Sequence, residues 1–186
     1  MVKLHGKDIY LAALERAHCH TIFATTTYDF DNPTDTIMFG CAVESADGWY
    51  EEIQKHLRED VNIRLGIFLN DGTVIGNIAL QGIDRRHRSA ELGIDIADAS
   101  HRGKGYGPQA IDLLLQYGFW NLGLERICAD VLDTNPPSQK ALTKAGFILE
   151  GRARHAEYFR GKYIDMLKYS ILKHEYRQKE QSPCMI

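Results

Sequence analysis

The sequence predicts a mixed α/β (α+β) fold, in which helices flank a largely antiparallel central sheet of about six to seven strands. Two kinds of hydrophobic periodicity alternate along the chain. Segments such as 90–97 show the period of two that is typical of a strand, whereas 108–119 carries apolar residues at helical spacing. Asn70-Asp71-Gly72 also separates two apolar runs, and this strong hairpin signal predicts antiparallel neighbours.

The first sixty residues are expected to form a helical region. Asp8 can cap a helix over about residues 8–28, and Ser45 can cap a second helix over about 46–58. In the second helix, Trp49, Ile53 and Leu57 recur at helical spacing.

The middle of the chain alternates strands and a helix. Strands are predicted over 62–69 and 73–80, on either side of the hairpin, and over 90–97 after a polar loop. A helix opened by Pro108 follows, and Gly123 is placed to end it. Its apolar face is formed by Ile111, Leu114, Leu115, Gly118 and Phe119.

The last elements complete the sheet. A strand is predicted over 125–132, and Asn135 is expected to cap a short helix that ends at Ala145, with Pro136 at its first position and Gly146 just beyond it. Strands over 147–151, 155–159 and 163–172 follow, the last two joined by a turn at 160–162.

The segment from Glu91 to Gly107 runs from a strand through a glycine-rich loop into a helix. Glycines let the loop backbone approach a ligand closely. The first amides of the helix lack intrahelical partners, and the helix dipole adds partial positive charge, so a pyrophosphate is expected to bind there. The loop residues that we expect to contact it are Arg102, Gly103, Lys104, Gly105, Tyr106 and Gly107.

Three kinds of phosphate loop compete for this segment. A nucleoside-triphosphate loop needs Ser or Thr after its lysine, but Lys104 is followed by Gly105. A dinucleotide loop belongs to the first strand-helix turn of a repeated βαβ domain, whereas this loop lies past mid-chain. The acyl-CoA pattern, Arg or Gln, two residues, Gly, one residue, then Gly or Ala, fits 102–107 without a gap. A tight turn without a ligand stays an alternative.

Further motifs accompany this loop in a fixed order. They are Glu91-Leu92-Gly93-Ile94 before it, Asn135-Pro136-Pro137-Ser138 and Ala145-Gly146-Phe147 after it, and Gly161-Lys162-Tyr163-Ile164-Asp165 near the end. With these motifs the chain resembles the GNAT superfamily of acyl-CoA N-acyltransferases, in the group that contains ribosomal-protein alanine acetyltransferases and spermidine acetyltransferases. The likeness covers about residues 62–176, and it implies the GNAT fold and acetyl-CoA as co-substrate.

The resemblance implies roles for the strand before the loop. Glu91 matches a family position where a carboxylate often acts as the base, commonly through water. By the period of two it shares a face with Asp95, and a structural pairing of Glu91 with Arg88 stays an alternative. Backbone groups of Ile94, Asp95 and Ile96 are expected to hold the pantetheine arm and the thioester carbonyl.

The short helix after Asn135 carries the remaining implied contacts. Asn135 is expected to contact pantetheine, and Ser138 is expected to hydrogen-bond the leaving thiolate, although Ser138 could simply close the first helical turn. Spermidine-acetylating relatives tend to carry a tyrosine where this chain has Leu142. Ser138 therefore favours a protein N-terminal α-amine as acceptor, and a polyamine is the alternative, favoured by an acidic loop with Asp29, Asp31 and Asp35.

Composition sets the remaining expectations. The chain has 186 residues, 44% of them hydrophobic and 25% charged, which suits a single enzyme domain over 1–186 with a tail at 177–186. A net charge of −3 does not favour nucleic acid and mildly favours a cationic amine. No apolar run reaches the length of a membrane span and no signal peptide is evident, so a cytoplasmic location is expected.

Neither the cysteines nor the histidines predict a metal site. The four cysteines are too far apart for a zinc knuckle, and they are expected to be free thiols. His18-Cys19-His20 would diverge on a helix, and the acidic loop lacks the glycine and glutamate of a calcium loop.

From the resemblance and the loop together we predict an acetyl-CoA-dependent N-acetyltransferase that acts on a primary amine without a metal, with a homodimer as one expectation. A non-catalytic acyl-CoA-binding domain is the alternative from another class.

Overall fold

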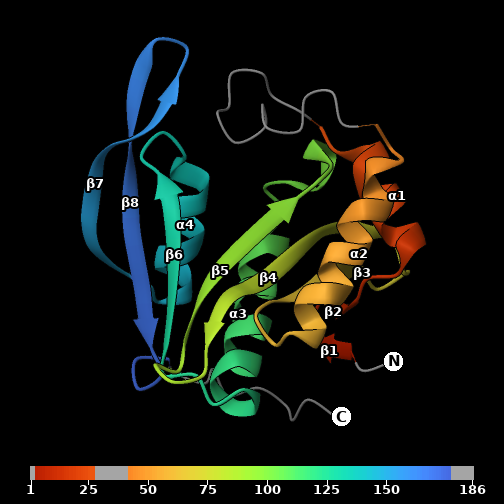
Figure 1. Cartoon of the computed structure of the whole chain (residues 1–186), viewed down its shortest axis with the longest axis horizontal. Coiled ribbons are helices and arrows are strands. Elements are labelled where there is room, and N and C mark those ends of the chain that lie inside the picture. Colours follow the sequence, from red (N-terminus) through yellow and green to blue (C-terminus); the bar gives the residue numbers. More distant parts are fainter. Residues whose placement is uncertain (1–2, 28–41, 177–186) are drawn as a thin grey trace.

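A twisted eight-stranded sheet runs through the computed structural model, which describes residues 3–27 and 42–176 (Figure 1). The strand order is β1-β2-β3-β4-β5-β6-β8-β7. Every neighbouring pair is antiparallel except β5 and β6, which are parallel. The strands are β1 Lys3–His5, β2 Ile9–Ala13, β3 Ile63–Leu69, β4 Val74–Asp84, β5 Ser89–Ile96, β6 Arg126–Leu132, β7 Ile148–Phe159 and β8 Lys162–Leu172.

Four α-helices cover the two faces of this sheet. They are α1 Arg16–Thr25, α2 Ser45–Arg58, α3 Tyr106–Gln116 and α4 Pro136–Ala145. Buried side chains of α3 and α4, such as Ile111 and Leu142, pack in one core cluster with Leu80 and Leu92 of the sheet. Buried side chains of α1 and α2 pack in a second cluster on the other face (Figure 1). The two faces can therefore serve two different ligands.

The largest difference from the sequence prediction lies at residues 8–28. The predicted helix was wrong over its first part, because residues 9–13 form β2, which pairs with β3. The carboxylate of Asp8 does not cap a helix but accepts a hydrogen bond of 2.8 Å from Nε2 of Gln109. Helix α1 begins only at Arg16, where Nδ1 of His18 accepts a hydrogen bond of 3.1 Å from the amide of Glu15.

The strand count also differs from the prediction of six to seven. Strands β1 and β2 are additional, and the segments predicted as separate strands at 147–151 and 155–159 form the single strand β7. An irregularity in the register with β8 bends β7 between Ala153 and Glu157, where His155 has a φ of 53°.

Helix starts shift by small amounts. Ser45 is the first residue of α2 instead of its cap, and α3 begins at Tyr106, two residues before Pro108. Helix α4 begins and ends where the sequence predicts, between the cap Asn135 and Gly146. None of the helices in the two described ranges is long and apolar enough to cross a membrane.

Candidate active site

Strands β5 and β6 separate in the middle of the sheet. They pair only at Ser89 with Arg126, Ala90 with Ile127 and Glu91 with Cys128. Beyond these pairs, β5 continues along β4 as far as Ile96, and β6 continues along β8 as far as Leu132 (Figure 1). Beyond Glu91 the edge of β5 that faces β6 therefore has no neighbouring strand among the described residues. The backbone of Ile94 on this edge can bind a ligand, whereas the carbonyl of Ile96 accepts a hydrogen bond from Arg102 and the carbonyl of Asp95 lies toward Gly76 of β4. A pantetheine contact by Ile94, Asp95 and Ile96 stays a prediction.

A close approach to β4 accompanies this separation. A Cβ at Gly76 would lie 2.1 Å from the carbonyl oxygen of Asp95, so only glycine fits. Strand β5 thereby follows β4 and leaves β6. The glycine at 76 is a site-forming residue that sequence reasoning missed, because a single glycine inside a strand has several explanations.

The glycine-rich loop lies at the end of β5 and leads into α3. Gly103 and Gly105 adopt φ values of 75° and 87°, which favour glycine. The backbone amides from Gly103 to Gly107 donate no hydrogen bond within the described parts of the chain. Five consecutive free amides at a helix N-terminus form a site for an anion such as a pyrophosphate.

Arg102 has a different environment from the one that the sequence led us to expect. Its Nε donates to the carbonyl of Ile96 at 2.9 Å, and its Nη2 donates to the carbonyls of Thr27 and Ala97 at 3.3 and 3.4 Å. The guanidinium thus ties the loop to the end of β5 and to the residues after α1. The side chain of Lys104 is exposed. A phosphate contact by either side chain stays a prediction.

Asn135 and Ser138 meet at the start of α4. Oδ1 of Asn135 accepts a hydrogen bond of 3.2 Å from the amide of Ser138, which assigns the amide orientation of the asparagine. Among the described residues, neither Nδ2 of Asn135 nor the hydroxyl of Ser138 has a partner. Both groups can therefore donate hydrogen bonds to a ligand between β5 and β6.

Glu91 occupies the point where the two strands separate. Its neighbours Ala90 and Leu92 are buried in the cluster beneath α3, so its own side chain lies on the opposite face, with Gln81 directly across on β4. Glu91 forms no ion pair with Arg88. The guanidinium of Arg88 instead has Nη2 at 3.8 Å from a carboxylate oxygen of Glu125. Burial raises the pKa of Glu91, the charge of Asp130 raises it further, and Lys168 opposes the shift. A carboxylate with a raised pKa at the point where two strands separate is suited to act as a base.

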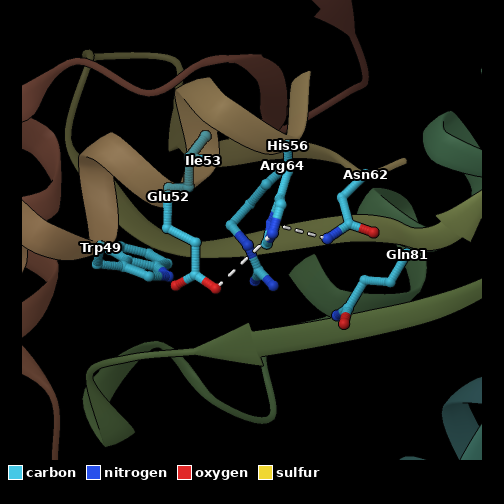
Figure 2. A pocket seen from close by; sticks show the side chains of 7 residues that line it. All are labelled: Trp49, Glu52, Ile53, His56, Asn62, Arg64 and Gln81. Atoms are coloured by element: carbon cyan, nitrogen blue, oxygen red, sulfur yellow. Dashed lines mark hydrogen bonds and ion pairs between the residues drawn. The ribbon is translucent and has the colours of Figure 1, made fainter. Parts of the chain in front are cut away.

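A cavity of about 190 Å³ lies on the same face, between α2 and strands β3 and β4 (Figure 2). It is lined by Trp49, Glu52, Ile53, His56, Asn62, Arg64 and Gln81. Because Gln81 pairs with Glu91 across the strands, this cavity adjoins the point where β5 and β6 separate. The cavity is a candidate for the acceptor side of the site and is called the acceptor cavity below. The sequence did not single out Arg64 or Gln81.

The family model of the acetyltransferase (GNAT) domain matches residues 9–148. This match includes α1, α2, the glycine-rich loop and α4. The chain belongs to the GNAT acetyltransferase family.

Relatives of known sequence and structure agree with this assignment. The N-acetyltransferase p20 of Bacillus licheniformis is 41% identical over 103 residues, which is 55% of this chain and 57% of p20. The ribosomal N-acetyltransferase-like protein YdaF of Bacillus subtilis is 36% identical over 75% of this chain and 78% of its own. The Vibrio cholerae spermidine N-acetyltransferase, solved with CoA and spermine, superposes with a TM-score of 0.77 at 28% identity, over 92% of this chain and 99% of that one.

As a GNAT member the chain is an acetyl-CoA-dependent N-acetyltransferase. The residues expected to bind acetyl-CoA lie on β5, in the loop that opens α3 and at the start of α4, and their contacts with acetyl-CoA stay predictions. The amides of 103–107 and the donors of Asn135 and Ser138, which donate no hydrogen bond within the described residues, are of the kind that an extended phosphorylated thioester needs.

Two other predicted features lie elsewhere. His18 packs edge-on against Phe68, with ring centroids 4.9 Å apart, whereas Nε2 of His20 lies 2.9 Å from Asp47. The acidic loop with Asp29, Asp31 and Asp35 lies outside the described residues.

Proposed function

We propose that this GNAT enzyme acetylates the α-amine at the N-terminus of a peptide or protein, by direct attack in a ternary complex. The observation that supports the proposal is the position of Glu91 in the last residue pair before β5 and β6 separate, a point that we call the fork. On one side of the fork lie the groups expected to bind acetyl-CoA, in the space between β5 and β6 that we call the wedge, and on the other side lies the acceptor cavity. An amine that enters from the α2 face would meet the thioester at this fork.

The chemistry then follows from groups at the fork. Glu91 takes a proton from the ammonium, directly or through a water, and the free amine attacks the thioester carbon. A backbone amide near Ile96 stabilises the tetrahedral oxyanion. As the C–S bond breaks, the hydroxyl of Ser138 donates a hydrogen bond to the CoA thiolate, and the second amine proton leaves to the base or to solvent. The products are the N-acetyl amide and CoA.

Ser138 supports an α-amine as acceptor, since the ribosomal-type relatives that this chain resembles rely on a serine at this position. The similarity to YdaF over three quarters of the chain supports the same class.

A polyamine is the second candidate acceptor. The carboxylate of Glu52 lies at the mouth of the cavity, where 61% of its side chain is exposed, and it could attract a distant ammonium group. The Vibrio cholerae relative was solved with spermine.

An acetyl-CoA-dependent thiol-release assay separates these candidates. The panel contains peptides with Ala, Ser or Met at the N-terminus, the same peptides with blocked N-termini, spermidine and spermine. We expect saturable release with free N-termini and none with blocked ones. Preference for spermidine would select the second candidate. If acetyl-CoA binds but no amine exceeds hydrolysis, a non-catalytic acyl-CoA-binding function replaces both.

We also propose a homodimer that forms through β7, in the cytoplasm. Strand β7 is the last strand of the sheet and pairs only with β8. Its surroundings expose large apolar side chains, with Ile148 53%, Leu149 51% and Tyr158 66% exposed. An open edge with apolar side chains favours pairing with a second copy. Light scattering on the purified chain tests this, and a monomer at micromolar concentration would contradict it.

A further inference from the structure

The positively charged guanidinium of Arg64 lies inside the acceptor cavity. The residue lies on β3, and Figure 2 shows its guanidinium pointing into the cavity that α2 covers. The carbon at the centre of the guanidinium lies 5.7 Å from the centroid of the Trp49 ring. Packing against this ring fixes the position of the side chain.

Few groups of the protein satisfy this guanidinium. Nη1 donates a hydrogen bond to Oδ1 of the buried Asn77, and this is the one hydrogen bond that Arg64 makes within the described residues. No carboxylate of these residues lies within 4 Å of it. Glu52 and Asp95 act on Arg64 at longer range, and burial lowers the pKa of Arg64. A partly buried arginine has five N–H donors, so the remaining donors are available to a ligand.

Asn62 and His56, two polar neighbours in the cavity, are already hydrogen-bonded to each other. Oδ1 of Asn62 accepts a hydrogen bond of 2.8 Å from the amide of Gly82, and its Nδ2 therefore donates to Nδ1 of His56 at 3.0 Å. Nε2 of His56 then points to Glu52, at 3.9 Å. Asn62 and His56 do not supply an oxygen acceptor to Arg64, so an oxygen of a ligand can accept hydrogen bonds from its remaining donors.

Arg64 lies on the same face of the sheet as Glu91, two strands away. It pairs with Ala79 of β4, and Ala79 pairs with Gly93 of β5. Two strand spacings place Arg64 about 10 Å from Gly93, which is two residues from Glu91 on the same face. A Cβ at Gly93 would lie 2.7 Å from Nε2 of Gln81, so the glycine makes room for the side chain of Gln81, which lies over it.

We propose that Arg64 determines acceptor specificity by binding a carbonyl or carboxylate oxygen on the carbon next to the attacking amine. This inference rests on the proposed function and narrows it. The amine lies toward Glu91 while the neighbouring oxygen lies toward Arg64, which is the charge arrangement of an α-amino acid or a peptide N-terminus. A polyamine would instead bring a second ammonium toward the guanidinium.

The test compares amines that differ only in this oxygen. L-Alaninamide carries a carbonyl, L-alanine carries a carboxylate, and 2-aminopropane has the same carbon skeleton without either. The proteins are the wild type, Arg64→Met, which keeps an unbranched stem against Trp49, and Arg58→Met, a matched control at the exposed end of α2. Thermal unfolding and acetyl-CoA affinity show that each variant is folded.

The readout is the ratio of kcat/KM for L-alaninamide to kcat/KM for 2-aminopropane. The basicity of each amine is the same in every assay, so a change in this ratio reports Arg64 alone. Arg64→Met should lower the ratio by about 10- to 100-fold, the usual range for a hydrogen bond to a charged group. Arg58→Met should leave the ratio unchanged. Arg64→Lys keeps the positive charge but lacks the planar guanidinium, and it should lower the ratio by less than Arg64→Met does.

L-Alanine distinguishes the two oxygen sources. Faster turnover with L-alanine than with L-alaninamide means that Arg64 binds a free carboxylate. Faster turnover with L-alaninamide means that Arg64 binds a peptide carbonyl. An equal loss for all amines in Arg64→Met and Arg64→Lys, or a wild-type preference for spermidine that survives both changes, would overturn the inference but keep the transferase. If no amine exceeds hydrolysis in the wild type, the proposed function fails and this inference fails with it.

Discussion

Glu91 and Cys128 form the last residue pair between β5 and β6. Up to this pair the two strands are neighbours in one sheet, and beyond it each follows a different partner. The point of separation therefore carries a carboxylate on the face of the sheet that α2 covers, while the amides of 103–107 and the hydroxyl of Ser138 stay without partners among the described residues. This relationship links the fold to acetyl transfer.

Gly76 is predicted to maintain this separation. In Gly76→Ala the new Cβ would collide with the carbonyl of Asp95, so β5 must move away from β4 and toward β6. We expect the free energy of unfolding to fall by about 1–3 kcal/mol, the usual cost of overpacking. Acetyl-CoA affinity should fall too, because the wedge narrows.

Gly48→Ala provides the control, since a Cβ there meets no atom within 4 Å in helix α2. It should stabilise the protein by about 0.5–1 kcal/mol. Denaturant unfolding and acetyl-CoA titration measure both effects. Equal acetyl-CoA affinity of Gly76→Ala and wild type would show that Gly76 does not shape the wedge.

Ser138 is predicted to act through its hydroxyl and not through the helix cap. Its amide, not its side chain, closes the turn with Asn135, so Ser138→Ala keeps the cap. The variant should unfold at the wild-type temperature, whereas kcat should fall by about 10- to 100-fold, as expected when a hydrogen bond to a charged group is lost.

Thr143→Ala is the matched change on the same helix, because the hydroxyl of Thr143 donates to the carbonyl of Gln139 at 2.9 Å. Its kcat should equal that of the wild type. Steady-state kinetics with saturating acetyl-CoA measure both variants, and an unchanged kcat in Ser138→Ala would remove Ser138 from the mechanism.

Glu150 is predicted to make stability depend on pH. Hydrogen bonds from Arg126, at 2.5 and 2.7 Å, and then from Ser170 lower the pKa of Glu150 from 4.5 to about 2. A carboxylate whose pKa is lower in the folded state stabilises that state above its unfolded pKa and loses this effect as the pH falls through the folded pKa. The stability difference between wild type and Glu150→Gln should therefore be largest above pH 4.5 and shrink toward pH 2.

Thermal unfolding as a function of pH measures this difference. Glu157→Gln is the control, since Glu157 is an exposed residue of the same strand that makes no ion pair within the described residues. A pH-independent difference for Glu150→Gln would contradict the assignment.

The elements with strong local signals could be predicted from the sequence. Asn135, Pro136 and Gly146 are a cap, a first-turn proline and a C-terminal glycine, and they place α4 at its observed bounds. The Asn70-Asp71-Gly72 hairpin similarly places β3 and β4. In both cases the determining interactions lie within a few residues of the element.

Elements that depend on distant partners could not be predicted. The apolar run Ile9–Ala13 fits either a helix or a strand, and pairing with β3, more than fifty residues away, decides for the strand. Asp8 likewise finds its partner in Gln109, 101 residues along the chain.

The candidate site shows the same division. The glycine loop, Glu91, Asn135 and Ser138 belong to compact motifs that a sequence displays. Arg64 and Gln81 become site residues only when α2 closes over β3 and β4, and Gly76 matters only because β5 passes close to it.

The most direct test of the account is the turnover of Glu91→Gln, measured together with acetyl-CoA affinity, beside Glu125→Gln as an exposed control. If Glu91 is the base at the fork, kcat/KM for the acceptor amine should fall by about 100-fold or more, while the Kd for acetyl-CoA stays at the wild-type value. Glu125→Gln should match the wild type in both. Wild-type turnover in Glu91→Gln would contradict the central claim that the carboxylate at the fork of β5 and β6 activates the amine.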